Sequence, residues 1–151
     1  MSFGESLAPL LGRFVMAWFF LTQAYHYALD WNNTAILLTM KDVPTPPVLL
    51  LIALVGIVLG SLSLVLGFCT RAGALALFAI TVAATVTMHD YWHLRVAAAR
   101  NADYDIFMRN MAIAGGLLML IGLGSGRFGM DNLKPKDGAA KSAVAAKRRE
   151  R

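Results

Sequence analysis

The stretch 47–68, PVLLLIALVGIVLGSLSLVLGF, carries no Asp, Glu, Lys, Arg or His over its whole length. An α-helix rises ~1.5 Å per residue, so about 20 apolar residues are enough to cross the ~30 Å hydrocarbon core of a bilayer. The sequence therefore predicts an all-α, polytopic membrane protein with four transmembrane helices. The other three apolar runs, with at most two of those residues each, are 7–29, 72–88 and 111–126.

The composition of the whole chain supports this prediction. Of the 151 residues, 58% are hydrophobic and 15% are charged, whereas soluble domains average about half and about a quarter. The second and third apolar runs are joined only by the tripeptide CTR at 69–71, which makes them antiparallel neighbours. We expect residues 1–133 to form one antiparallel four-helix bundle. Its spans are expected at residues 7–29, 48–68, 72–90 and 107–123.

Positive charge is concentrated on one side of the predicted bundle. After Gly126 the chain has eight Lys and Arg residues against three acidic ones, and residues 134–151 are expected to form a basic, flexible tail. With Arg13 and Arg71, this side holds ten of the fourteen Lys and Arg residues. The positive-inside rule therefore places both termini, and the tail, in the cytoplasm. The expected partner of the tail is the anionic lipid surface and not nucleic acid.

Two longer connections follow the first and third spans. Residues 30–47 contain TAILLTM (34–40), which is too short to cross and is expected to lie at the interface as a helix or to pack against the bundle. Residues 91–108 are polar and mixed in charge, and they are expected to extend the third helix outward before the chain turns at about Asn101. Both connections are predicted on the outer side, away from the termini.

Several residues in or near the spans are predicted to have structural roles. The Gly56-x-x-x-Gly60 spacing lets two membrane helices approach closely, and we interpret it as packing. Arg13 and Arg109 lie near the ends of apolar spans, where an unpaired charge is costly. Each is long enough to snorkel toward water, and a structural ion pair is the role we expect for each. The single cysteine, Cys69, excludes an intramolecular disulfide and is interpreted as a small apolar residue at a helix end.

Two further charged residues are predicted to hold helix ends. Arg71 is expected to bond the C-terminal carbonyl groups of the second span. Asp131 follows the glycine-rich stop GLGSGRFGMDN and is expected to cap the last helix or to pair with Arg71 or Arg127. Both roles would stabilise the cytoplasmic end of the bundle.

The segment TMHDYWHL at 87–94 holds two of the three histidines and is the main candidate for chemistry. On a helix, His89 and His93 would share one face because they are four residues apart. Two ligands are too few for a tight metal site, and a third would have to come from His26 together with an aspartate. Two histidines on one helix also cannot sandwich a haem iron. We therefore expect no metal site.

Two interpretations of this segment stay open. Aromatic rings are enriched at headgroup level, so Tyr91 and Trp92 are typical of an interfacial belt. Alternatively, His89, Tyr91 and Trp92, with His26 at a similar depth, form a contact for a quinone headgroup or for a protein partner. A quinone is therefore the one cofactor that these residues suggest.

Three segments together resemble the DoxX family. LVLGFCTRAGALALFAITVAATVTMH (64–89) is similar to its small-residue helix, its Thr-Arg link and a third helix that ends in histidine. MRNMAIAGGLLMLIGLGSGRFGMDN (108–132) is similar to its last helix and glycine-rich end, and GRFVMAWFFLTQAYHYA (12–28) resembles its first helix. The resemblance covers about residues 7–133, which is nearly everything except the tail.

The resemblance implies a four-helix protein of the bacterial inner membrane, in a family associated with redox chemistry. Relatives include a DoxD-type subunit of thiosulfate:quinone oxidoreductase and proteins proposed to anchor soluble redox enzymes. Four residues of this chain fall on recurring family positions: Arg71, His89, Asn110 and Asp131.

The chain departs from the family pattern at two positions. Many relatives carry a glutamate in the second helix where this chain has Ile57. A lysine that is common near the end of the first helix falls at Tyr25 or His26. The resemblance therefore implies that this chain lacks a charged pair that many relatives carry in the membrane.

We predict a membrane subunit that anchors or completes a larger, quinone-linked redox complex and offers a quinone or lipid groove. Its partners would be membrane lipids and other protein subunits. One alternative is an oxidoreductase subunit that acts on quinone directly, with His89 near the acceptor. Another is a small transporter or lipid-handling protein, which the unbroken helices disfavour. No P-loop, Rossmann glycine pattern, Gly-x-Ser-x-Gly or His-Glu-x-x-His motif supports a stand-alone hydrolase or dehydrogenase.

Overall fold

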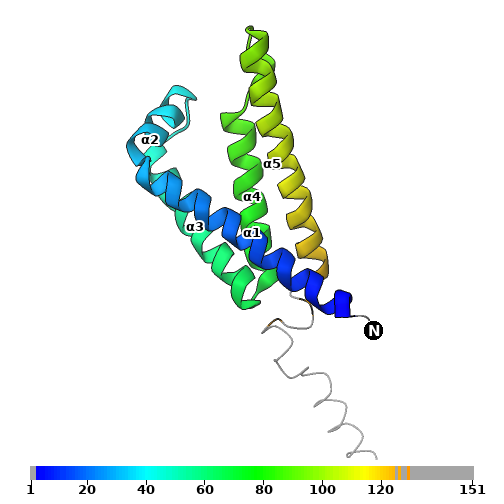
Figure 1. Ribbon diagram of the computed structural model, residues 1–151. Coiled ribbons are helices and arrows are strands. Elements are labelled where there is room, and N and C mark those ends of the chain that lie inside the picture. Colours follow the sequence, from blue (N-terminus) through cyan, green and yellow to red (C-terminus); the bar gives the residue numbers. More distant parts are fainter. Residues whose placement is uncertain (1–2, 125, 127–128, 130–151) are drawn as a thin grey trace, which may run out of the picture.

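A computed structural model of the chain describes residues 3–124, 126 and 129. Figure 1 shows these residues as long helices joined by short connections. Within the described ranges all regular secondary structure is helical, as the sequence predicts. The elements are α1 (Phe3–Leu29), α2 (Trp31–Met40), α3 (Pro46–Leu66), α4 (Thr70–Met88), the short 3₁₀ helix η1 (Tyr91–His93) and α5 (Ala97–Leu123).

Four of the helices, α1, α3, α4 and α5, are long and apolar enough to cross a membrane. α3 has 21 residues, which at ~1.5 Å per residue spans ~32 Å. α5 has 27 residues and spans ~40 Å, longer than the ~30 Å hydrocarbon core. The protein is therefore an all-helical membrane protein with four spanning helices, which confirms the predicted fold class at this level.

The helix bounds differ most from the predicted spans in α5. α3 and α4 lie within two residues of the predicted second and third spans. α5 begins at Ala97, ten residues before the predicted start. The turn predicted at about Asn101 is therefore wrong, and the chain turns at residues 89–96 instead. Hydropathy marks only the apolar part of a helix, whereas polar residues with adequate helix propensity extend it beyond the membrane.

α2 is the helix that the sequence predicts within the first outer connection. It has ten residues, too few to cross, and it packs against α3 and α1. Thr34 is buried, and its hydroxyl donates a hydrogen bond to the carbonyl oxygen of Asp30 over 2.9 Å. Of the two predicted placements, packing against the bundle is the one observed.

The bundle is closed at one end and open at the other. α1 packs against α3, α3 against α4 and α4 against α5. Figure 1 shows the α1–α3 pair and the α4–α5 pair meeting where α3 leads into α4, which we name the closed end, and diverging toward the open end. Most of the apolar core lies in the half nearer the closed end. The core residues are Ala17, Phe20, Ala24, Ile57, Leu64, Ala74, Leu77 and Leu117.

Glycines let α3 and α4 approach each other closely. A Cβ atom added to Gly60 would lie 2.7 Å from Cγ of Leu77 and 3.2 Å from the carbonyl oxygen of Gly73. A Cβ atom added to Gly56 would lie 2.6 Å from Cδ1 of Ile80. Both members of the predicted Gly-x-x-x-Gly pair therefore lie in the α3–α4 interface, where a larger side chain would push the helices apart.

The turn between α3 and α4 uses a left-handed backbone twice. Gly67 has a φ of +64° and Cys69 a φ of +50°, and the left-handed conformation is costly for residues other than glycine. The hydroxyl of Ser63 donates a hydrogen bond to the carbonyl oxygen of Phe68 over 2.6 Å, which holds the turn. Cys69 is exposed at the start of α4.

Two arginines lie beside helix C-termini at the closed end. Arg13 is only 1% exposed, and a Cβ atom added to Gly67 would lie 3.1 Å from its Nη2. Protein therefore surrounds this charge at the end of α3 and separates it from water, and the ion pair expected for Arg13 stays a prediction. Arg71 Nη2 donates a hydrogen bond to the carbonyl oxygen of Gly122 over 3.3 Å. Arg71 therefore holds the end of α5, whereas the sequence predicted that it would hold the end of the second span. Both placements favour the cations, because helix C-termini carry partial negative charge.

Of the remaining charged residues with predicted structural roles, only Arg109 lies in the described part of the chain. Arg109 is exposed on α5. Asp131, Arg127 and the basic tail at 134–151 lie outside the described residues, so the roles given to them stay predictions.

Candidate functional site

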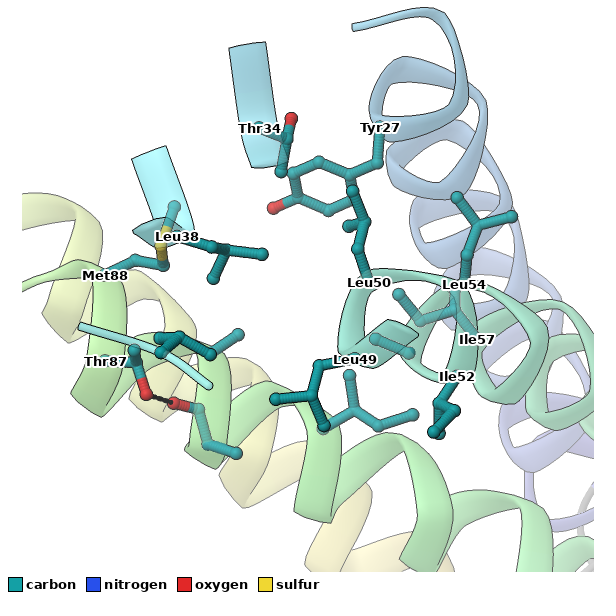
Figure 2. A pocket seen from close by; sticks show the side chains of 15 residues that line it. Tyr27, Thr34, Leu38, Leu49, Leu50, Ile52, Leu54, Ile57, Thr87 and Met88 are labelled. Carbon is teal, nitrogen blue, oxygen red and sulfur yellow. Dashed lines mark hydrogen bonds between the residues drawn. The ribbon is translucent and has the colours of Figure 1, made fainter. Parts of the chain in front are cut away.

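An apolar groove lies between α3 and α4 in the open half of the bundle, with α2 along one side (Figure 2). Its volume is about 310 Å³, at the lower end of the ~300–1,000 Å³ typical of small-molecule sites. Its walls are almost entirely aliphatic, which suits an apolar ligand. Representative lining residues are Leu38 from α2, Leu50 and Ile57 from α3, and Ile80, Ala84 and Met88 from α4.

The groove runs along the helices. Leu50 and Ile57 are seven residues apart on α3, which corresponds to ~10 Å. Ile80 and Met88 are eight residues apart on α4, which corresponds to ~12 Å. The groove therefore extends from the open end to about the middle of α3, because Ile57 lies eleven residues, or ~17 Å, from the start of that helix at Pro46. Ile57, where the family resemblance places a glutamate, lies at its deep end.

Tyr27 supplies a polar group to this apolar groove, because its hydroxyl points into the space (Figure 2). Thr34 and Thr87 also line the groove, but their hydroxyls donate to the carbonyl oxygens of Asp30 and Ala83 over 2.9 and 2.8 Å. No hydrogen bond joins the Tyr27 hydroxyl to another residue in the described part of the chain. This hydroxyl is therefore available to a ligand.

An ion pair joins the two connections at the open end. The Lys41 ammonium, directly after α2, contacts the Asp90 carboxylate, shortly after α4. The second carboxylate oxygen of Asp90 lies 3.4 Å from Nδ1 of His93. Because α2 and α4 both line the groove, the Lys41–Asp90 pair ties its two sides together at the outer end.

His89 faces α5 and does not line the groove. Its Nδ1 lies 2.7 Å from Oδ1 of Asp103, and the two side chains are 23% and 18% exposed. α4 ends one residue before His89, so His89 and His93 do not share a helix face, and that prediction is wrong. His89 and Asp90 therefore lie in the connection between α4 and η1, where they contact Asp103 and Lys41.

Tyr91 and Trp92 lie together at the open end, in an aromatic cluster with residues of α5. The Tyr91 ring centroid is 5.1 Å from that of Trp92, 5.2 Å from that of Tyr104 and 5.3 Å from that of Phe107, all with edge-to-face geometry. His26 is exposed on α1 and joins neither this cluster nor His89. Among the predicted candidates, Tyr91 and Trp92 therefore contact each other, whereas His89 contacts Asp103 and His26 lies on α1. In the part of the chain that is described, no three His, Cys, Asp or Glu side chains are grouped to hold a metal ion.

The helices and the groove define a small multi-pass membrane protein. The DoxX family model matches residues 8–90, more than half of the chain, so the chain belongs to the DoxX family. All residues that line the groove lie within this match, whereas α5 lies beyond it.

One relative is similar to this chain over most of the length of both proteins. The inner membrane protein YphA of Escherichia coli (strain K12) is 27% identical over 122 residues, which cover 81% of this chain and 86% of the relative. No solved structure matches the chain. With its four spanning helices, the protein is a multi-pass protein of the inner membrane.

Proposed function

We propose that the protein is a non-catalytic membrane subunit of a larger redox complex, in which the apolar groove holds an isoprenoid quinone. In this proposal the bundle is antiparallel and both termini lie in the cytoplasm. The excess of Lys and Arg on the side of the termini supports this orientation. The open end then faces outward, where a partner subunit would meet the groove.

The observation that carries the proposal is the combination of an apolar groove with one available hydroxyl. The isoprenoid tail would lie along the aliphatic side chains of Ile57, Ile80 and Ala84. The quinone ring would lie near the outer end, where the Tyr27 hydroxyl can donate a hydrogen bond to a ring carbonyl oxygen. A ligand with a long apolar tail and a polar carbonyl therefore matches both parts of the groove.

The groove walls support a binding role in preference to catalysis. Apart from Tyr27, no residue that lines the groove has a titratable side chain. Reduction of a quinone consumes protons, and efficient proton transfer uses a side chain such as His, Asp or Glu within hydrogen-bond reach. In this proposal a partner subunit supplies the chemistry, and this chain positions the quinone.

A second candidate function is favoured by the contact between His89 and Asp103. A carboxylate 2.7 Å from Nδ1 fixes the orientation of the imidazole and favours one tautomer, as general acid–base catalysis requires. A subunit that reduces quinone directly would use this histidine. We rank this function second because His89 does not line the groove.

The proposal is tested by measuring the quinone that remains bound after gentle extraction of the native complex. Replacing Ala84 by Phe should fill the groove and reduce the quinone-to-protein ratio several-fold. Ala76→Phe is the matched control, because Ala76 is also exposed on α4 but does not line the groove. Mass analysis of the same sample identifies the subunits that travel with the chain.

Tyr27→Phe provides a finer test of the same site. It removes only the hydroxyl, so quinone retention should fall about fivefold, since one hydrogen bond contributes about 1 kcal/mol. Equal quinone content in wild type and Ala84→Phe would contradict the proposed site. Retention of phospholipid alone would favour a lipid-handling protein, and a chain that purifies alone and reduces quinone would favour the second candidate.

A further inference from the structure

A second hollow, separate from the groove, lies where η1 meets the first turns of α5. It has a volume of about 320 Å³. Tyr91 and Trp92 come from η1, and Arg100, Asn101 and Tyr104 come from α5. Arg100 and Tyr104 are four residues apart and share a helix face. The hollow is therefore built from two elements that the aromatic contacts hold together.

The lining of this hollow is rich in hydrogen-bond donors and has no carboxylate. The Arg100 guanidinium, the Asn101 amide and the Tyr104 hydroxyl all offer N–H or O–H groups. Of the carboxylates close in sequence, Asp90 contacts a lysine, Asp103 contacts a histidine, and Asp105 does not line the hollow. Within the described residues no ion pair involves Arg100. The hollow is therefore complementary to an anionic oxygen acceptor.

The position of the hollow relative to the hydrocarbon core indicates which anion it would bind. α5 spans ~40 Å, so its first turns extend past the ~30 Å hydrocarbon core into the headgroup region. Tyr91 and Trp92 are residue types that concentrate at this depth, and Trp92 is 49% exposed. The anions that a membrane presents continuously at this level are the phosphate groups of its lipids.

We propose that this hollow binds the phosphate headgroup of an anionic phospholipid. Arg100 pairs with the phosphate, Asn101 and Tyr104 donate hydrogen bonds to its oxygens, and the exposed Trp92 ring packs on the glycerol end of the acyl chains. This site goes beyond the proposed function, because it lies outside the quinone groove and outside the segment that the family model matches.

The fluorescence of Trp92 offers a direct test. The chain has three tryptophans, so Trp18→Phe and Trp31→Phe leave Trp92 as the only indole, adjacent to the site. The full chain is placed in phosphatidylcholine nanodiscs with increasing fractions of phosphatidylglycerol. The Trp92 emission should shift and saturate, and Arg100→Gln should weaken the response about tenfold, because a charged hydrogen-bond partner is lost. Arg109→Gln, which removes the same charge from an exposed site on the same helix, should leave it unchanged.

Native mass spectrometry provides a second measurement that does not depend on the Trp substitutions. Wild type should retain phosphatidylglycerol in preference to phosphatidylcholine, and Arg100→Gln should lose this preference. Equal responses of the Arg100→Gln and Arg109→Gln variants would overturn the proposal. Saturation by soluble glycerol phosphate would also overturn it, because the site would then bind free phosphate and not a lipid. Since no quinone is involved, neither result depends on the proposed function.

Discussion

The closed and open ends of the bundle are made of the same long helices but differ in how closely these helices pack. At the closed end, glycines bring α3 and α4 together, and Arg13 and Arg71 lie beside the ends of α3 and α5. At the open end the helix pairs diverge, the Lys41–Asp90 pair joins the two connections, and His89 contacts Asp103 of α5. The comparison indicates that close packing is concentrated at the closed end, whereas the groove and the hollow beside η1 lie at the open end.

The largest expected effect comes from disturbing the closed end. Gly60→Val should destabilise the protein by about 1–3 kcal/mol, because its side chain would collide with Leu77 and with the backbone of Gly73. Gly115→Val is the matched control, since a Cβ atom at Gly115 has no neighbour within 4 Å. Thermal unfolding in detergent measures both. Equal melting temperatures for the two variants would show that the closed end is not the tightly packed part of the molecule.

An intermediate effect is expected at the contact between α4 and α5. His89→Leu should cost about 1–2 kcal/mol, because it removes a part-buried hydrogen bond to the Asp103 carboxylate. His93→Leu should change stability by less than about 0.5 kcal/mol, because the His93 side chain is 75% exposed. The same unfolding assay compares the two histidines. A larger effect at His93 would contradict the assignment of the interhelical contact to His89.

The smallest effect is expected at the ion pair beside the groove. Lys41→Met should lower the melting temperature only slightly, because exposed ion pairs contribute little to stability. The difference from wild type should disappear at about 1 M salt, where the Debye length falls to ~3 Å. A loss as large as that of Gly60→Val, or one that salt does not change, would mean that the open end is held as firmly as the closed end.

The fold was largely predictable from the sequence because its signals are local. The uncharged runs predict the spans, and the Gly56–Gly60 spacing predicts a close helix contact. The start of α5 was not predictable in this way, because Asn101 and its polar neighbours continue a helix whose apolar part begins later. Hydropathy therefore located the membrane-embedded helices better than their outer ends.

The candidate site was much less predictable, because its residues come from separate elements. The groove combines Tyr27, Leu38 and Ile57 with residues of α4, and no spacing in the sequence relates them. No motif around Tyr27, near the outer end of the first predicted span, distinguishes it from other interfacial aromatic residues. Asp103 is fourteen residues from its partner His89, beyond any helical repeat. The prediction that His89 and His93 share a helix face was wrong because that spacing requires a continuous helix, and α4 ends before His89.

The burial of Arg13 has a consequence for the order in which the protein is made. The side chain lies against the end of α3, and Gly67 is synthesised more than fifty residues after Arg13. While α1 is alone in the bilayer, its arginine has no such protein surroundings and is more stable near the lipid–water boundary. We therefore expect α1 to reach its final depth only after α3 has been inserted. A late docking step of this kind would couple the position of α1 to completion of the α3–α4 hairpin.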